Sequence, residues 1–168
     1  SRQSFKKIVS EIYSPPRVTK LLNESRSKHF IPGLALDLTV VDPDDGRPWD
    51  FSLKSKREKA RQLFRQQKPY LLIGSPECKH FSTWFALNEA RSTDAQAMQR
   101  ARTQAVKHLE FVASLYVEQL QEGRYFLHEH PQHATSWMER VMKELMEIKE
   151  VIRTNADQCQ FGAEVKHG

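Results

Sequence analysis

The sequence has few cysteines and no long apolar run, and each absence excludes a class of protein. Its two cysteines, Cys78 and Cys159, are too few and too far apart for a disulfide framework or a Cys-x-x-Cys metal knuckle, which fits a reducing compartment. No stretch approaches the roughly 18 uncharged apolar residues that cross a bilayer, and the first residues lack the apolar core of a signal peptide. We therefore expect an intracellular protein with no membrane association, in either the nucleus or the cytoplasm.

Neither sign of charge dominates, and no repeat or low-complexity tract interrupts the chain. The 168 residues include 26 Lys and Arg against 21 Asp and Glu, so the net charge is only +5. This modest excess suits a polyanionic partner without identifying one. With 39% hydrophobic and 28% charged residues, the composition predicts a single globular domain over residues 1–168.

Short apolar segments alternate with longer amphipathic ones, which is typical of α/β proteins. We predict strands at 7–13, 33–41, 69–75, 124–129 and 151–153, and a short edge strand at 49–53. We predict helices at 55–67 and 94–122, a helix that follows Ser14 with Pro15 and Pro16 in its first turn, and a final helix opened by a Ser136/Glu139 capping box. Each main strand precedes a segment able to cross over, so we predict a mostly parallel sheet with helices on both faces.

Three of the predicted strands end in polar clusters, at 11–17, 74–82 and 126–131, which would meet at one edge of a parallel sheet. In the second cluster Lys79 and His80 follow Cys78, and their positive charge would favour the nucleophilic thiolate. The alternative is a small buried apolar side chain. Glu129 follows an apolar run, and burial would let it hold a proton as a general acid. The alternative is a carboxylate that caps the next turn.

A family resemblance rests on these two clusters. The run Gly74-Ser-Pro-Glu-Cys-Lys-His-Phe-Ser82 resembles the Gly-Gly-Pro-Pro-Cys-Gln-x-Phe-Ser loop of the DNA cytosine-5 methyltransferases, and Leu127-His-Glu-His-Pro131 is similar to their Glu-Asn-Val strand end. The resemblance implies a Rossmann-like, S-adenosylmethionine-dependent methyltransferase fold. It implies that Cys78 attacks C6 of cytosine, that Glu129 engages the ring at N3, and that C5 receives the methyl group. Methyltransferase-like segments of mobile-element polyproteins are similar in the same motifs.

The resemblance also implies which residues contact the cofactor. The cofactor contacts are Ser14, Asp37, Asp50, Gly74, Ser75 and Pro76, with Asp37 at the family's acidic cofactor position and Asp50 near its adenine contact. Independently of the resemblance, we expect Arg17, Lys79, His80 and Ser82 to contact the nucleic acid, and Arg17 and Lys79 are nominated for contact with either a phosphate or the carboxylate of the cofactor. DNA is the expected partner and RNA remains open. The chain has no room for the family's target-recognition domain, so another polypeptide or domain is expected to supply that function.

The chain departs from the family at the first loop, where Ser14-Pro15-Pro16-Arg17 replaces Phe-x-Gly-x-Gly. It also carries His130 where the family has asparagine. These departures support a second hypothesis, in which the chain is a catalytically inactive methyltransferase-like module that binds nucleic acid or protein.

Three further patterns have competing interpretations. The residues His128, His130, His133 and Cys159 are soft metal ligands by type, but nothing in the sequence brings Cys159 near the others, and we predict no metal site. The aromatic residues Tyr13, Phe81, Trp84 and Phe85 are of the type that stacks on a displaced base, or else they belong to the core. The basic helix 54–65 either follows phosphates or is a solvated helix face.

Overall fold

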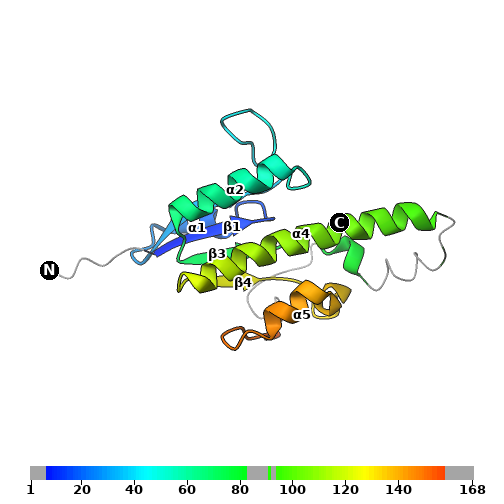
Figure 1. The fold of residues 1–168 in the computed structure, drawn as a ribbon. Helices are drawn as coiled ribbons and strands as arrows, with labels where there is room; N and C mark the ends of the chain where they lie inside the picture. The colour runs from blue at the N-terminus through cyan, green and yellow to red at the C-terminus, as the bar shows by residue number, and fades with distance from the viewer. Residues whose placement is uncertain (1–6, 83–90, 92–93, 158–168) are drawn as a thin grey trace, which may run out of the picture.

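A computed structural model describes residues 7–82, 91 and 94–157 of the chain. Figure 1 shows a small twisted sheet with long helices packed along it. The strands are β1 (Lys7–Ile12), β2 (Phe30–Leu36), β3 (Leu71–Gly74) and β4 (Tyr125–His128). All of them are parallel, in the order β2-β1-β3-β4. The predicted α/β class and the predicted parallel pairing of the third and fourth of these strands are confirmed, and the sheet is compatible with a Rossmann-like fold.

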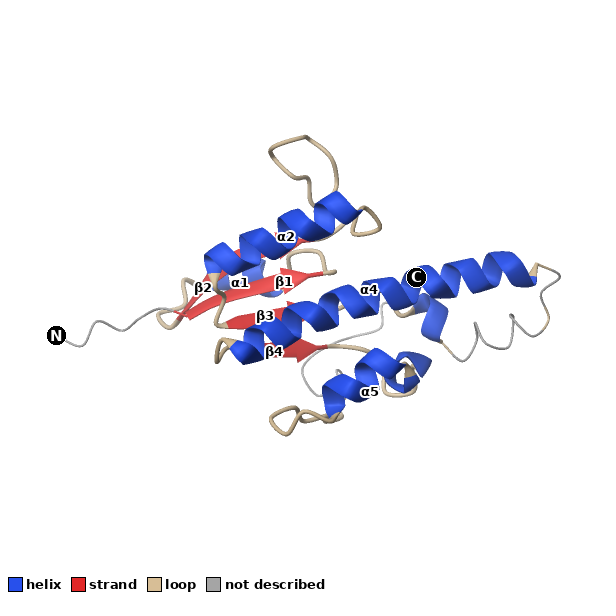
Figure 2. Ribbon diagram, in the orientation of Figure 1, coloured by secondary structure: helices blue, strands red, loops and turns tan. Residues whose placement is uncertain are grey.

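Helices cover both faces of this sheet, as parallel sheets require. They are α1 (Val18–Ser25), α2 (Lys54–Gln67), α4 (Ala95–Gln121) and α5 (Arg140–Met146), with short 3-10 turns η1 (Lys79–Phe81) and η2 (Thr135–Met138). Successive residues of a strand point to opposite faces. Ser10 bonds Gln67 of α2, whereas Glu11 bonds the start of α1, so these two helices lie on opposite faces (Figure 2). None of the helices in the described ranges is long and apolar enough to cross a bilayer.

The core lies between the sheet and the predicted apolar stripe of α4. Residues Ala105, Leu109, Val112 and Tyr116 of this stripe are buried, against Ile12 and Leu72 among others. The packing is close at Gly74, because a Cβ at this position would overlap the Tyr116 hydroxyl. The phenol therefore lies directly against the carboxyl end of β3.

The first helix begins later than predicted, and its cap comes from the sheet. Glu11 is fully buried in β1, and its carboxylate accepts hydrogen bonds from the amides of Arg17, Val18 and Thr19 and from the Thr19 hydroxyl, at 2.7–3.4 Å. Ser14 does not cap α1, and Pro15 and Pro16 precede the helix instead of forming its first turn. A buried carboxylate thus satisfies the amides that a helix start leaves unpaired.

Two predicted strands and one predicted cap are wrong. Residues 151–153 are not a strand, and Ile152 is 86% exposed. Residues 49–53 form a turn that buries Trp49 and Phe51 in the core, because aromatic packing holds this segment without a ladder of hydrogen bonds. No capping box joins Ser136 and Glu139: the Ser136 hydroxyl is buried against His130, and α5 begins only at Arg140.

The charges of the basic helix α2 are largely engaged within the protein. Lys56 and Lys59 pair with Asp42, which is buried, and also with Asp45 and Asp44 respectively. On the next turns, Arg61 and Arg65 both pair with Glu118 of α4. These ion pairs anchor the helix to the loop before it and to α4, which favours a structural role over the phosphate-binding one.

Candidate functional site

The ends of β3 and β4 come together as the sequence predicted. The Glu129 amide donates to the Gly74 carbonyl at 3.0 Å, and the Ser75 hydroxyl donates to the Glu129 carboxylate at 3.2 Å. One residue further, His130 Nε2 lies 2.7 Å from the Pro76 carbonyl. The polar clusters at 74–82 and 126–131 therefore lie side by side at one edge of the sheet, with successive residues in contact.

Cys78 lies in the loop that leaves this edge. The loop runs from Ser75 to η1, and the Cys78 carbonyl accepts the Phe81 amide at 2.8 Å, which closes the short turn. The thiol is half-buried and free, and Lys79 beside it is exposed. A half-buried cysteine is partly accessible to a reagent or substrate.

The predicted burial of Glu129 is wrong. The strand leading to it has an apolar sequence, but β4 is an edge strand in the described part of the chain and its alternate residues Tyr125 and Leu127 are themselves half-exposed. Glu129 follows the same alternation and is exposed. Its carboxylate is therefore placed by Ser75 and not by an apolar pocket.

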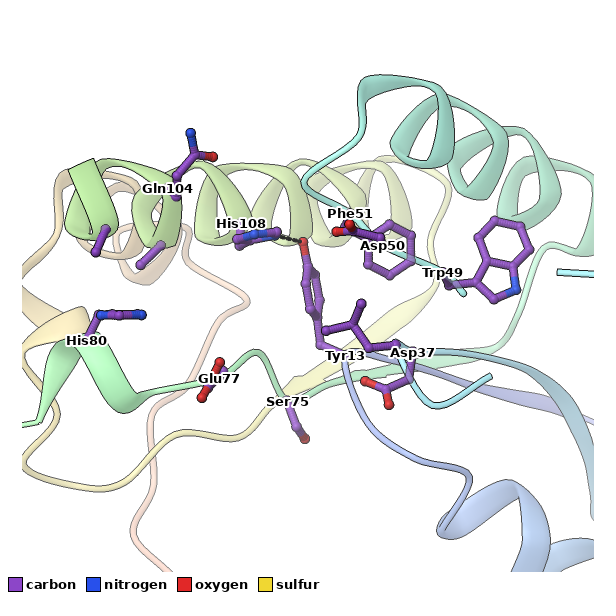
Figure 3. Close-up of a pocket in the computed structure, with 13 residues that line it drawn as sticks. Tyr13, Asp37, Trp49, Asp50, Phe51, Ser75, Glu77, His80, Gln104 and His108 are labelled. Atoms are coloured by element: carbon purple, nitrogen blue, oxygen red, sulfur yellow. Dashed lines mark hydrogen bonds between the residues drawn. The ribbon is translucent and has the colours of Figure 1, made fainter. Parts of the chain in front are cut away.

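A cavity of about 300 Å³ lies beside the loop, at the carboxyl ends of β1, β2 and β3. Figure 3 shows its walls: Tyr13 rises from β1 toward α4, Ser75 and Glu77 lie on the loop after β3, and Asp50 and Phe51 come from the turn before α2. Cavities at this edge of a parallel sheet are where α/β proteins bind their ligands.

Tyr13 and His108 form a hydrogen-bonded pair in this cavity. The Tyr13 hydroxyl lies 2.8 Å from His108 Nδ1 (Figure 3). Burial raises the pKa of Tyr13 well above its usual value. Burial, with a smaller contribution from the Arg57 guanidinium, lowers the pKa of His108, so the ring is neutral at neutral pH. Tyr13 has a φ of 61°, a left-handed conformation that is unusual for a bulky side chain and that turns the ring toward α4.

The cavity wall is acidic and aromatic. Its charged side chains are Asp37, Asp50 and Glu77, and neither lysine nor arginine is among the described residues that line it. Hydrogen bonds from Ser52 hold the pKa of Asp50 below its usual value, so it stays ionised. In a chain of net positive charge, this concentration of carboxylates favours a ligand that carries positive charge and a flat ring system.

The predicted cofactor residues divide into two groups. Asp37, Asp50 and Ser75 line the cavity. The other three are engaged in the fold: Ser14 is buried and bonds Pro15 and Arg17, Gly74 packs on Tyr116, and the Pro76 carbonyl accepts from His130.

The predicted nucleic-acid contacts come from two parts of the chain, the loop after β3 and the start of α1. Lys79 is exposed, and the hydroxyl of Ser82, three residues later, donates to its carbonyl. His80 lines the cavity, whereas Arg17 lies at the start of α1 and donates to Ser14.

The aromatic residues considered for base stacking have different positions. Tyr13 lines the cavity and Phe81 is buried. Trp84 and Phe85 lie outside the described residues, as does Cys159.

The histidines of the third cluster are part of the packing. His128 Nδ1 lies 2.9 Å from the Tyr116 hydroxyl, and burial lowers the pKa of His128 to about 3. His130 is held between Pro76 and Ser136, while His133 is exposed. Across the described ranges, no group of three His, Cys, Asp or Glu residues is arranged to hold a metal ion.

Sequence reasoning missed several residues of this site. His108 lies on the inner side of α4, four residues before the buried Val112, and this helical spacing was the available signal. Trp49 and Phe51 were assigned to an edge strand, although they line the cavity. The pairing of His130 with Ser136 depends on tertiary structure and left no signal in the spacing.

Comparisons with protein-family models, curated proteins and solved structures found no match for this chain. The function must therefore be argued from the site itself.

Proposed function

We propose that the chain is a methyltransferase-like domain that transfers a methyl group from S-adenosylmethionine to C5 of cytosine in DNA. The observation that supports this most is the contact between the Cys78 loop and Glu129 beside an acidic cavity. In this proposal the Cys78 thiolate adds to C6, and Glu129, oriented by Ser75, engages N3 of the ring. The target base must leave the duplex to be reached.

The lining of the cavity suits the cofactor in its charge and its aromatic side chains. S-adenosylmethionine supplies an electrophilic methyl group on a positively charged sulfur. Carboxylates of Asp37 and Asp50 complement positive charge, and the rings of Trp49 and Phe51 offer apolar contact to a purine. Nucleotides that carry phosphates would meet only negative charge at this wall.

Two observations support the alternative, a catalytically inactive module that binds nucleic acid or protein. Glu11 already occupies the amides at the start of α1, and Pro15 and Pro16 follow where the resemblance calls for glycines that let a cofactor approach the backbone. Binding measurements separate the two proposals.

The first test is ligand binding, by calorimetry and by the shift in melting temperature. Because a ligand that binds only the folded state stabilises it, S-adenosylmethionine and S-adenosylhomocysteine should both raise the melting temperature, and AMP should not. Asp50→Asn should weaken binding, whereas Asp44→Asn, which changes an exposed aspartate outside the cavity, should not. A folded sample with no shift at millimolar cofactor would favour the inactive module.

The second test is covalent trapping. An oligonucleotide with 5-fluorocytosine should form a lasting adduct in the presence of the methyl donor, because fluorine replaces the C5 proton whose loss releases the enzyme. Mass spectrometry should locate the adduct on Cys78. Cys78→Ser should abolish trapping, Cys159→Ser should preserve it, and Glu129→Gln should slow it by roughly 10²–10⁴-fold, as the loss of a general acid does. An adduct on Cys159 would contradict the site assignment.

A further inference from the structure

The loop that carries Cys78 is held at both ends by one short stretch of chain. This stretch runs from the end of β4 through η2 and contributes His130, Thr135 and Ser136. His130 contacts the Pro76 carbonyl before the cysteine, and Thr135 contacts the Phe81 carbonyl after it. Cys78 lies between these two fixed points.

The hydrogen bonds of His130 define its protonation. A carbonyl only accepts, so Nε2 carries the proton and donates to Pro76 at 2.7 Å. Nδ1 then accepts from the Ser136 hydroxyl at 2.6 Å. Ser136 is fully buried, and the His130 ring also packs near Phe81 and Trp137. The imidazole therefore connects η2 rigidly to the start of the loop.

Thr135 completes the attachment at the other end. Its hydroxyl donates to the Phe81 carbonyl at 3.0 Å, and the Phe81 ring is 1% exposed. The Phe81 amide in turn donates to the Cys78 carbonyl at 2.8 Å. A displacement of Thr135 would therefore reach the cysteine backbone through two hydrogen bonds.

We infer that His130 and Thr135 are positioning residues that set the reactivity of Cys78 by fixing the two ends of its loop. The inference about the thiol stands on the hydrogen bonds alone. Its consequence for methyl transfer rests on the proposed function: a thiolate must approach C6 from a defined direction, so a loosened loop should slow adduct formation.

The test measures the rate at which Cys78 displaces iodide from iodoacetamide, in a Cys159→Ser background, with mass spectrometry of the Cys78 peptide. The thiol is half-buried, so release of the loop should expose it. His130→Ala and Thr135→Val should each raise the rate about threefold to tenfold, the ratio that corresponds to one hydrogen bond. Thr135→Ser keeps the hydroxyl and should react like the parent.

Two further variants of His130, to glutamine and to asparagine, distinguish an effect on the position of the loop from an effect on general stability. Glutamine carries its amide nitrogen about as far from Cβ as Nε2 of histidine, whereas asparagine is one atom shorter. His130→Gln should therefore restore the parent rate, and His130→Asn should resemble His130→Ala. Met142→Ala removes a buried side chain of α5 and should lower the melting temperature while leaving the rate within about twofold, since it removes no hydrogen bond to the loop.

The outcomes distinguish this inference from the proposed function. Rates in His130→Ala and Thr135→Val that equal the parent rate, or a glutamine variant that reacts like alanine, would overturn the inference. If His130→Ala does not fold, the alkylation rates of His130→Gln and His130→Asn are compared instead, and equal rates would overturn the inference. Trapping with 5-fluorocytosine should move in the opposite direction, slower where alkylation is faster. Absence of trapping in the parent protein would remove the proposed function but leave the alkylation result standing.

Discussion

At the scale of single residues, Glu11 has two structural roles, as a buried residue of β1 and as the cap of α1, and the sequence gives no reason to connect them. It occupies an inward position of a central strand, and it holds the start of α1 with four donors. An alternating strand pattern predicts an apolar residue there, and a helix cap is expected within a few residues of the helix. The carboxylate is instead six to eight positions away from its partners, so only the fold reveals it.

Replacement of Glu11 therefore should be costly. Glu11→Ala leaves the buried amide of Thr19 and the partly buried amide of Val18 without their acceptor, and we expect a loss of about 2–4 kcal/mol in the free energy of unfolding. Glu11→Gln retains one acceptor oxygen and should lose less. Urea denaturation followed by circular dichroism measures both.

The matched control is Glu24→Gln, on the same helix. Glu24 is exposed and pairs with the exposed Lys20 at 3.9 Å, so its loss should change stability by less than about 0.5 kcal/mol. Equal effects at the two positions would show that Glu11 does not hold the helix.

At the scale of elements, α2 shows how a basic segment can be structural. Lys56 and Lys59 of this helix share the buried carboxylate of Asp42. Burial alone would raise the pKa of Asp42, but hydrogen bonds from Lys56 and Lys59 outweigh it and hold the pKa well below the usual range. The loop and the helix are thereby locked together.

We expect Asp42→Asn to lower the melting temperature by about 5–10 °C, because the buried Lys56 loses its nearest counter-charge. Asp44→Asn removes a partner that is 74% exposed and should lower it by less than about 2 °C. Differential scanning calorimetry at low salt makes the comparison. Similar shifts in the two variants would mean that the buried carboxylate is not the centre of the network.

The elements that sequence predicted well are those whose pattern is local. The apolar run of β3 and the stripe of α4 specify their own structure, and both are found where expected. Residues 151–153 have a β-branched pair, Val151 and Ile152, but no strand within the described ranges pairs with them. Trp49 and Phe51 alternate like a strand and yet form a turn. An alternating apolar pattern indicates which side chains are buried, but it does not indicate whether the backbone pairs with another strand.

The candidate site follows the same division. The meeting of the Cys78 loop with Glu129 was predictable, because parallel strands place their carboxyl ends together. The acidic cavity was predictable only in part, through Asp37 and Asp50. The contacts of His108 and His130 depend on how α4 and η2 pack on the sheet, and no spacing along the chain encodes them.

At the scale of the whole molecule, three half-buried histidines make stability depend on pH. Burial lowers the pKa of His108, His128 and His130, and that of His128 falls to about 3. Between the unfolded value near 6.5 and the folded value, the unfolded chain binds more protons. Stability is therefore fully present above about pH 6.5 and is lost as the pH falls below it.

We expect the free energy of unfolding to decrease from pH 7 to pH 4, with His128 contributing up to about 1.4 kcal/mol per pH unit. His128→Gln should flatten this dependence, and the same change at exposed His29 should not. Urea unfolding at a series of pH values measures the slope. A stability that is constant over this range would contradict the burial of these rings.

The strand order also bears on how the protein is made. A parallel sheet has no hairpins, so each pairing must close a long segment of chain, and such sheets form slowly. In the order β2-β1-β3-β4, however, every strand that leaves the ribosome finds its neighbour already synthesised: β2 and β3 each add to β1, and β4 adds to β3. No strand must be inserted between two earlier ones. The sheet can therefore grow outward during translation, and the loop with Cys78 reaches its final contacts only after β4 and η2 have emerged.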